Sequence, residues 1–304
     1  MSRENHASEA KPRFRIAWAR HAVQIFALAL FCTPLLTVGW QLAGLFPGSE
    51  DALPTPAELP FFGSLSSSTV AGVNVLDPFA MLQIAAASKT FALSWLTGML
   101  PVLIVYGLIR GRAFCGWVCP VNLLLECTDA LRRKLGLKVA EAPVPRRAKI
   151  GVAAGVVIAS ALASIPLFEA VSPISAVNKG ILFGSSVGIL VLLAIVAVEL
   201  FWARRVWCRA LCPLGGFYEV LGRAGQLNVR IDADACVHCD ACKHACLADP
   251  SILDPALAGS DGIVRAGDCM ACGACIDACP TRALSFSAGR CGRRSYGPKR
   301  TENP

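Results

Sequence analysis

The sequence predicts an α-helical polytopic membrane protein with four transmembrane helices, followed by a small cysteine-rich α+β domain. Of its 304 residues, 55% are hydrophobic and only 16% are charged, whereas an ordinary soluble domain carries about 25% charged residues. The apolar residues are concentrated in four runs, and nearly all of the 15 cysteines lie outside those runs. This combination excludes an ordinary soluble enzyme.

The four apolar runs define the predicted membrane domain, which occupies residues 21–203 after a basic tail at 1–20. They lie at 21–46, 91–109, 150–168 and 181–203. Each is close to or above the roughly 20 residues that a helix needs to cross about 30 Å of hydrocarbon. We therefore expect four membrane-spanning helices.

The basic residues are distributed unevenly between the two predicted sides of the membrane. If the chain crosses four times, 27 of its 29 Lys and Arg lie on one side, and only Lys89 and Lys179 lie on the other. Positive charge collects in this way on the cytoplasmic side. We therefore expect a bacterial inner (cytoplasmic) membrane protein with both termini in the cytoplasm. Topology accounts for the net charge of +8, so we expect no nucleic-acid partner.

An internal repeat with an offset of 93 residues relates the second and fourth runs. Its two copies are Phe114-Cys115-Gly-Trp-Val-Cys119-Pro120 and Trp207-Cys208-Arg-Ala-Leu-Cys212-Pro213, followed by Glu126 and Glu219. The pairs Asp77-Pro78 and Ser172-Pro173 precede the copies at a nearly equal offset. The pattern predicts two hairpin repeats in parallel orientation, related by an axis along the membrane normal.

Two cysteine runs follow the repeat. They read Cys236-x2-Cys239-x2-Cys242-x3-Cys246 and Cys269-x2-Cys272-x2-Cys275-x3-Cys279-Pro280. In this bacterial iron–sulfur spacing, three cysteines bind one cluster and the fourth reaches the other cluster. Zinc sites typically use two CxxC pairs per ion, which this spacing does not match. The sequence thus predicts a bacterial-ferredoxin-like domain with two [4Fe-4S] clusters.

The crossed pattern assigns four ligands to each predicted cluster. The first set is Cys236, Cys239, Cys242 and Cys279, and the second set is Cys246, Cys269, Cys272 and Cys275. The resulting domains are an inner loop at 110–149 with the first repeated motif, the second motif and a connector at 204–229, the ferredoxin-like domain at 230–288, and a tail at 289–304. We expect the clusters on the cytoplasmic side.

The chemistry of the duplicated motif stays open at the level of sequence. A spacing of four places two sulfurs on one helical face, so Cys115, Cys119, Cys208 and Cys212 could converge on a third cluster or on one metal ion. The alternatives are a redox-active thiol pair and cysteines that only pack. These four cysteines are the candidates for a catalytic role.

Glu199 is a further catalytic candidate, because a charge near the inner end of the fourth run is costly inside a membrane. The alternative is an ion pair with Arg204 or Arg205. Glu126 and Glu219 fit proton handling near the interface, and they fit helix capping or ion pairs equally well.

These motifs resemble those of the NapH family, the ferredoxin-type membrane components of periplasmic nitrate reductase systems. The resemblance rests on the paired FCxWVCP and WCxxxCP motifs, on Leu76-Asp77-Pro78 with Leu82-Gln83, on the Ser172-Pro173-Ile174-Ser175 turn, and on the two cysteine runs. It implies an electron-transfer subunit of a quinol dehydrogenase module. Membrane quinol is the implied donor, and a periplasmic iron–sulfur protein and a terminal reductase are the implied partners.

A second function remains open, because membrane ferredoxins of methylamine utilisation and certain oxidase assembly proteins share this plan. In that case the chain would act in the assembly or maturation of another metalloenzyme.

Overall fold

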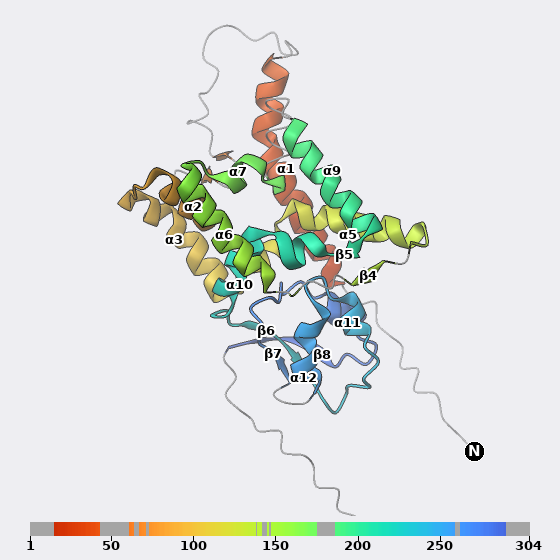
Figure 1. The fold of residues 1–304 in the computed structure, drawn as a ribbon. Helices are drawn as coiled ribbons and strands as arrows, with labels where there is room; N and C mark the ends of the chain where they lie inside the picture. Colours follow the sequence, from red (N-terminus) through yellow and green to blue (C-terminus); the bar gives the residue numbers. More distant parts are fainter. Residues whose placement is uncertain are drawn as a thin grey trace, which may run out of the picture.

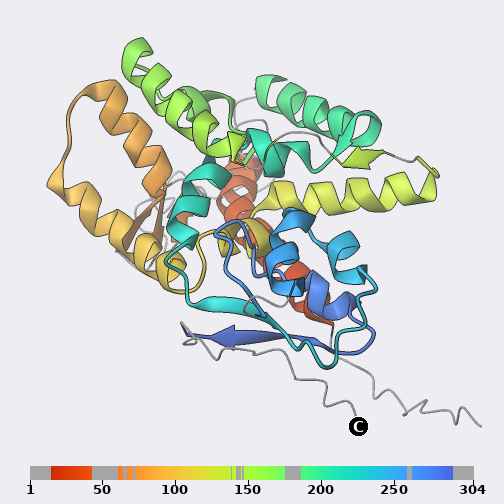
Figure 2. The ribbon, with the colours of Figure 1, turned by 60° about the horizontal axis from the view of Figure 1, so that its bottom comes forward.

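The computed structural model describes residues 15–42, 61–63, 67–70, 73–137, 139–141, 145, 147–174, 186–258 and 262–289. Residues 1–14 of the predicted basic tail therefore lie outside the described residues, as does the C-terminal tail from residue 290. Figure 1 shows a helical part that carries the tail domain on one side, and the same arrangement is visible after rotation in Figure 2.

The helical part contains nine α-helices or helical turns and one π-helical turn within the described ranges. They are α1 (Ile16–Leu42), α2 (Pro78–Ser88), α3 (Leu93–Leu108), α4 (Ala113–Trp117), α5 (Pro120–Lys134), α6 (Ala148–Ala163), α7 (Leu167–Val171), α9 (Ser186–Phe201), η2 (Trp207–Leu211) and α10 (Pro213–Gly222). Helix α6 packs against both α2 and α10. A side chain at Gly216 of α10 would collide with the Lys149 carbonyl of α6, so glycine permits this close approach.

Two small sheets accompany the helices. The strands β1 (Phe61–Gly63), β2 (Ser67–Val70) and β3 (Val73–Leu76) form an antiparallel meander. The short strands β4 (Ala140–Glu141) and β5 (Ala203–Arg204) pair in parallel. The meander delivers the chain to Asp77, which caps α2.

The tail domain is built on a three-stranded antiparallel sheet of order β7-β6-β8. Its elements are β6 (Leu227–Ile231), α11 (Ala241–Ala245), the 3-10 turn η3 (Pro250–Leu253), α12 (Asp254–Leu257), β7 (Ile263–Val264), α13 (Ala274–Ala278) and β8 (Leu284–Ala288). Asp240 and Gly273 precede α11 and α13 in left-handed conformation, with φ of 56° and 72°. The two cysteine runs thus share one loop-and-helix geometry.

The predicted four-span membrane fold is wrong. Within the described ranges, no helix combines the length and the apolar character needed to cross a bilayer. The second and third apolar runs give α3 and α6, which have 16 residues each. At 1.5 Å per residue such a helix is about 24 Å long, which is short of the ~30 Å of hydrocarbon. Helix α6 ends where Ser164 adopts a left-handed conformation with φ of 56°.

The predicted location in the inner membrane is wrong for the same reason as the predicted fold. A four-span position in the inner membrane, with both termini and the clusters on the cytoplasmic side, required those spans, and the described helices do not supply them. The membrane argument for Glu199 is lost for the same reason.

The 93-residue sequence repeat corresponds to a repeat of structural elements. The order α3, α4, α5 in the first copy matches α9, η2, α10 in the second. One continuous core extends from this repeat into the tail domain, and it includes Phe114 and Tyr218 on the helical side and Val229 and Met270 on the tail side. The two parts therefore fold against each other.

Candidate functional site

The four cysteines of the duplicated motif occupy matching positions in the two copies. Cys115 lies in α4 and Cys208 in η2, whereas Cys119 and Cys212 are the N-cap residues of α5 and α10. Proline follows each N-cap at the first helical position, where no N–H is needed. The backbone N–H of Gly215 donates to Cys212 Sγ at 3.4 Å. The partial positive charge of a helix N-terminus favours a thiolate at these two caps.

The structure brings the four motif thiols together in the core. All four are only 7 or 8% exposed. Burial raises the pKa of Cys208 and of Cys212 to about 12, and neighbouring thiols add to both shifts. The pKa of Cys119 is also raised, first by burial and then by Cys115, Cys208 and Cys212. The free thiols of Cys119, Cys208 and Cys212 are therefore protonated at neutral pH, and metal binding there would release protons.

Two buried arginines connect the copies of the repeat. Arg112 and Arg205 each precede the first motif cysteine by three residues, and they are 1% and 2% exposed. Arg112 Nη2 donates to the Cys208 carbonyl oxygen at 2.8 Å, and Arg205 Nη1 donates to Asn122 Oδ1 at 2.7 Å. Each copy of the repeat thus donates a hydrogen bond from a buried arginine to the other copy. Sequence reasoning missed Arg112 and considered Arg205 only as a partner of Glu199, although the two arginines share the 93-residue offset.

An ion network extends from Arg112 to the tail domain. Asp268 Oδ1 pairs with Arg112 Nη1 and with Lys149 Nζ, and Lys149 Nζ lies 3.3 Å from Glu219 Oε2. Burial opposes the charge of Asp268, but Arg112 and Lys149 outweigh it and lower the pKa of the carboxyl. Asp268 directly precedes Cys269. The network therefore links the motif thiols to the second cysteine run.

Four thiols of the tail line one small enclosed cavity. They are Cys246, Cys269, Cys272 and Cys275, and Val229 and Leu253 are among the apolar residues that complete the wall. Cys246 comes from the first run and the others from the second, as in the crossed set assigned to the second cluster. Burial raises the pKa of Cys246 and of Cys275, and neighbouring thiols add to each shift.

The other four tail cysteines lie nearer the surface. Cys242 is buried, Cys236 and Cys279 are half-buried, and Cys239 is exposed. Burial raises the pKa of Cys242, and Cys236 contributes to the shift. Burial acts in the same direction on Cys279, but hydrogen bonds outweigh it and lower its pKa. One of them comes from the Ala283 N–H to Cys279 Sγ at 3.3 Å.

The cysteine loop of the tail is seated directly on α4. A Cβ atom at Gly116 would lie 2.9 Å from the Met270 carbonyl oxygen and 3.4 Å from Cys272 Cβ. Trp117 Nε1 donates to the Ala271 carbonyl oxygen at 3.0 Å. The motif copy with Cys115 is therefore in direct contact with the loop that carries Cys269 and Cys272.

Arg110 fastens the tail sheet to the helices. It is 1% exposed, and its guanidinium donates to the carbonyl oxygens of Leu227 and Val264 at 3.1 and 3.0 Å. It also donates to Asn228 Oδ1. A buried cation with several acceptors fixes the orientation of the tail domain relative to α3.

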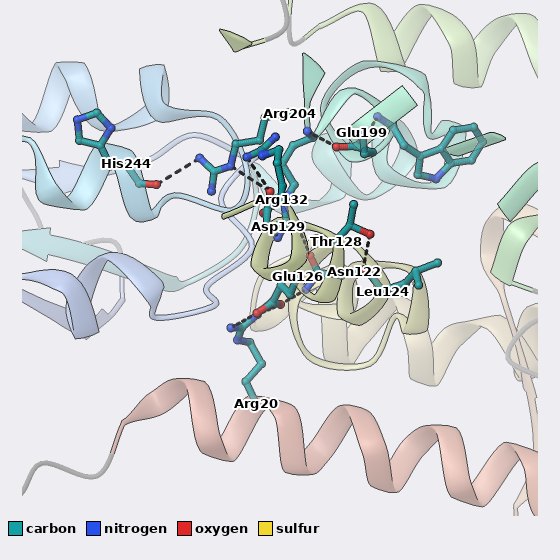
Figure 3. Close-up of polar contacts among 12 residues, drawn as sticks. Arg20, Asn122, Leu124, Glu126, Thr128, Asp129, Arg132, Glu199, Arg204 and His244 are labelled. Carbon is teal, nitrogen blue, oxygen red and sulfur yellow. Dashed lines mark hydrogen bonds and ion pairs between the residues drawn. The ribbon is translucent and has the colours of Figure 1, made fainter. Parts of the chain in front are cut away.

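Two of the predicted acidic residues, Glu126 and Glu199, form separate contacts, and both are labelled in Figure 3. Glu126 Oε2 accepts from Arg20 Nη2 of α1 at 2.7 Å. Glu199 is 3% exposed, and it accepts from the backbone N–H groups of Trp207, at 3.1 Å, and of Arg205. Glu199 therefore holds the turn before Cys208. Its contact with Arg205 runs through the backbone and is not an ion pair between the side chains.

The donor sets suit iron–sulfur clusters, which are held by cysteine thiolates. In the part of the chain that the structure describes, no three His, Cys, Asp or Glu side chains are close enough to hold a single metal ion. The ligands of a [4Fe-4S] cluster each bind a different iron, so they surround a wider space.

Comparison with known families locates iron–sulfur domains in both parts of the chain. A family described as a 4Fe-4S binding domain matches residues 91–138 and 186–232. A family described as a 4Fe-4S dicluster domain matches residues 228–280. The first family covers the two copies of the repeated motif, and the second covers both cysteine runs.

Relatives align over most of the chain. The methylamine utilization ferredoxin-type protein MauN of Methylorubrum extorquens is 34% identical over 270 residues, which are 88% of this chain and 87% of the relative. MauN of Paracoccus denitrificans is 35% identical and covers 82% of each chain. The ferredoxin-type protein NapH of Haemophilus influenzae is 30% identical and covers 90% of each chain. No solved structure matches the chain significantly.

Proposed function

The chain belongs to the family of ferredoxin-type proteins that includes NapH and MauN, and we propose that it oxidises quinol and passes the electrons on. The family and its 4Fe-4S domains make it an iron–sulfur electron-transfer protein. In the proposed role, the electrons leave through a partner iron–sulfur protein towards a nitrate reductase. The observation that carries the proposal is the direct contact between the motif copy at Gly116 and the Cys269–Cys272 loop.

We propose that the two tail sets hold one [4Fe-4S] cluster each. The cavity between Cys246, Cys269, Cys272 and Cys275 supports the crossed assignment of the second cluster. The first cluster would be held by Cys236, Cys239, Cys242 and Cys279. When bound, each cluster supplies a one-electron acceptor. The exposed Cys239 gives the first set a surface position, which suits delivery of electrons to a partner.

We propose that the motif thiols hold a third [4Fe-4S] cluster between the two copies of the repeat. Cys115, Cys119, Cys208 and Cys212 are all buried and are close enough to raise one another's pKa. The 4Fe-4S binding domain family matches both copies, which supports a cluster over thiol chemistry or packing. Arg112 would balance part of the negative charge of the thiolates.

A second function is favoured by the MauN relatives, which are 34 and 35% identical to the chain, against 30 and 32% for two NapH relatives. These relatives are named for methylamine utilisation. The corresponding role would be electron supply during the maturation of another metalloenzyme, such as a methylamine dehydrogenase or a copper oxidase.

One experiment separates the two functions. The gene is deleted, reduction of the terminal enzyme by quinol is assayed in cell extracts that still hold its partners, and the terminal enzyme is then purified and assayed for its cofactor. An electron-transfer role predicts a fully assembled terminal enzyme that quinol no longer reduces. A terminal enzyme that lacks its mature cofactor would contradict the electron-transfer role and support maturation.

A further inference from the structure

A cavity next to the motif thiols has the composition of a site for an aromatic alcohol. Its volume is about 130 Å³, close to the ~150 Å³ of an engineered protein cavity that holds one benzene ring. Three of its lining residues are sequence neighbours of the motif cysteines or of the prolines that follow them, namely Phe114, Val118 and Leu214. A ring bound there would lie beside the motif thiols.

The wall of the cavity is aromatic. Phe114 and Tyr218 are stacked with ring centroids 5.5 Å apart, and Tyr106 meets both rings edge-on at 5.8 and 5.7 Å. Aromatic walls favour a planar ring through offset and edge-to-face contacts. The remaining wall includes Val102 and Ile174, which are apolar.

The polar groups of the cavity include two carboxylates. Asp77 and Glu169 both line it, together with Ser68 and Ser172. Asp77 and Ser172 are the residues before proline in the two X-Pro pairs, so the fold brings the two pairs to one place. A ring with two hydroxyl groups needs such a combination of apolar walls and a few convergent polar groups.

Asp77 has a second role that must be separated from ligand binding. It is the N-cap of α2, and its oxygens accept long hydrogen bonds of 3.4 and 3.3 Å from the N–H groups of Phe79 and Ala80. Tyr218 Oη donates to Asp77 Oδ1 at 3.2 Å. Two carboxylate oxygens offer about four acceptor sites in all, so one remains for a ligand hydroxyl.

The electrostatic surroundings suit a proton acceptor. Burial raises the pKa of Asp77 to about 7, and Glu169 adds to the shift, although the two N–H groups and Tyr218 act against it. A capping aspartate normally stays ionised far below neutral pH. Asp77 instead exchanges its proton in the range where general bases work best.

We propose that this cavity is the quinol site of the chain and that Asp77 accepts a proton from the bound quinol. The proposal rests on the proposed quinol oxidation. Conversion of one quinol to quinone breaks two O–H bonds and releases two protons and two electrons. Asp77 takes one proton and Glu169 the other, and the chain's iron–sulfur clusters, when bound in the oxidised state, would supply two one-electron acceptors. Electrons would leave past the motif thiols and the contact between α4 and the second cysteine run.

The test uses the full chain with its clusters, duroquinol as a soluble one-ring quinol, and dithionite as a reductant that needs no quinol site. Asp77→Asn keeps the helix cap, because asparagine caps as well as aspartate, but it cannot take the proton. Val102→Trp fills the cavity. Asp254→Asn is the control, since Asp254 is an exposed acid that pairs with Lys243 at 2.9 Å in the tail domain.

The readouts are iron content, the rate of cluster reduction and the Kd of duroquinone by calorimetry. We expect Asp77→Asn to slow reduction by duroquinol at least tenfold and to leave reduction by dithionite unchanged. Val102→Trp should weaken duroquinone binding at least tenfold, and Asp254→Asn should match the wild type.

One outcome would contradict the position of the quinol site, and a different outcome would contradict quinol oxidation itself. If both cavity variants keep their iron and match the wild type in rate and Kd, the site is wrong and quinol oxidation stands. If dithionite reduces the wild-type clusters and duroquinol does not, quinol oxidation itself is wrong.

Discussion

Arg112 of the first repeat copy donates from Nη2 to the carbonyl oxygen of Cys208 in the second copy, at 2.8 Å. The same guanidinium pairs through Nη1 with Asp268, next to Cys269 of the tail. One buried side chain therefore joins both copies of the repeat and the second cysteine run. The charge of Arg112 therefore stabilises the contact between the two repeat copies and the contact of the first copy with the tail domain.

Removal of Arg112 should destabilise the folded protein strongly. Arg112→Ala leaves Asp268 buried with one cation fewer, and breaking a buried pair in this way costs about 3–5 kcal/mol. Arg133→Ala, which removes an exposed arginine of α5, should stay within about 0.5 kcal/mol of wild type. Chemical denaturation of the cluster-loaded chain under anaerobic conditions measures both changes. Equal stabilities of the two variants would contradict the role of Arg112.

Substitutions in the two tail sets should damage different clusters. Cys279→Ala should reduce the EPR signal of the first cluster more than that of the second, because the crossed assignment places Cys279 with Cys236, Cys239 and Cys242. Cys275→Ala should do the reverse. If Cys279→Ala removes only the second cluster, the crossed assignment is incorrect.

The motif cysteines should account for one third of the iron. A chain with three [4Fe-4S] clusters carries about twelve irons, four in each cluster, and Cys115→Ser or Cys212→Ser should lower the content to about eight. Cys127→Ser is the matched control, because Cys127 is exposed and lies outside all three sets. Unchanged iron and sulfide in the two motif variants would support a packing role for these cysteines.

The rate of reduction by duroquinol should depend on pH through Asp77. Below about pH 7 the Asp77 carboxyl holds a proton and cannot accept another, so the rate should rise as pH rises through about 7. Glu169, Tyr106 and Tyr218 are the other titratable groups of this cavity. The potential of the quinol also varies with pH, so the ratio of wild-type to Asp77→Asn rates is the quantity to plot. A ratio that does not change between pH 5.5 and 8.5, about 1.5 pH units either side of the expected pKa, would exclude Asp77 as the proton acceptor.

The same carboxyl should affect stability. Between about pH 4 and pH 7 the folded protein binds a proton at Asp77 that the unfolded chain has already lost, so stability falls as pH rises through this range. Above about pH 7 the contribution is constant. The slope should be absent in Asp77→Asn, and denaturation at a series of pH values measures it. An identical slope in the variant would show that another group causes it.

The parts of the site that depend on the spacing of residues along the chain could be predicted from the sequence. The 93-residue offset identified Cys115 with Cys208 and Cys119 with Cys212, and the structure brings all four together. The offset holds because each copy repeats the same helix, turn and proline-started helix. Because the two copies share this backbone geometry, the same residue types recur at the same positions in both.

Long-range contacts could not be read from a single sequence. Arg112 and Asp268 are 156 positions apart, and nothing in the spacing of charges pairs them. The membrane prediction failed for a related reason. Hydropathy measures how apolar a run is, but the ends of α6 depend on local geometry such as the left-handed Ser164. The run therefore gave a helix of 16 residues.

Anaerobic reduction of the intact protein by duroquinol, followed by EPR, tests the central claim most directly. The signal is compared with that of the same sample after dithionite. We predict that duroquinol produces a substantial share of the dithionite signal and that, in samples frozen at the same early time, the share is smaller in Asp77→Asn. Clusters that dithionite reduces fully and duroquinol leaves oxidised would contradict the claim that quinol is the electron donor.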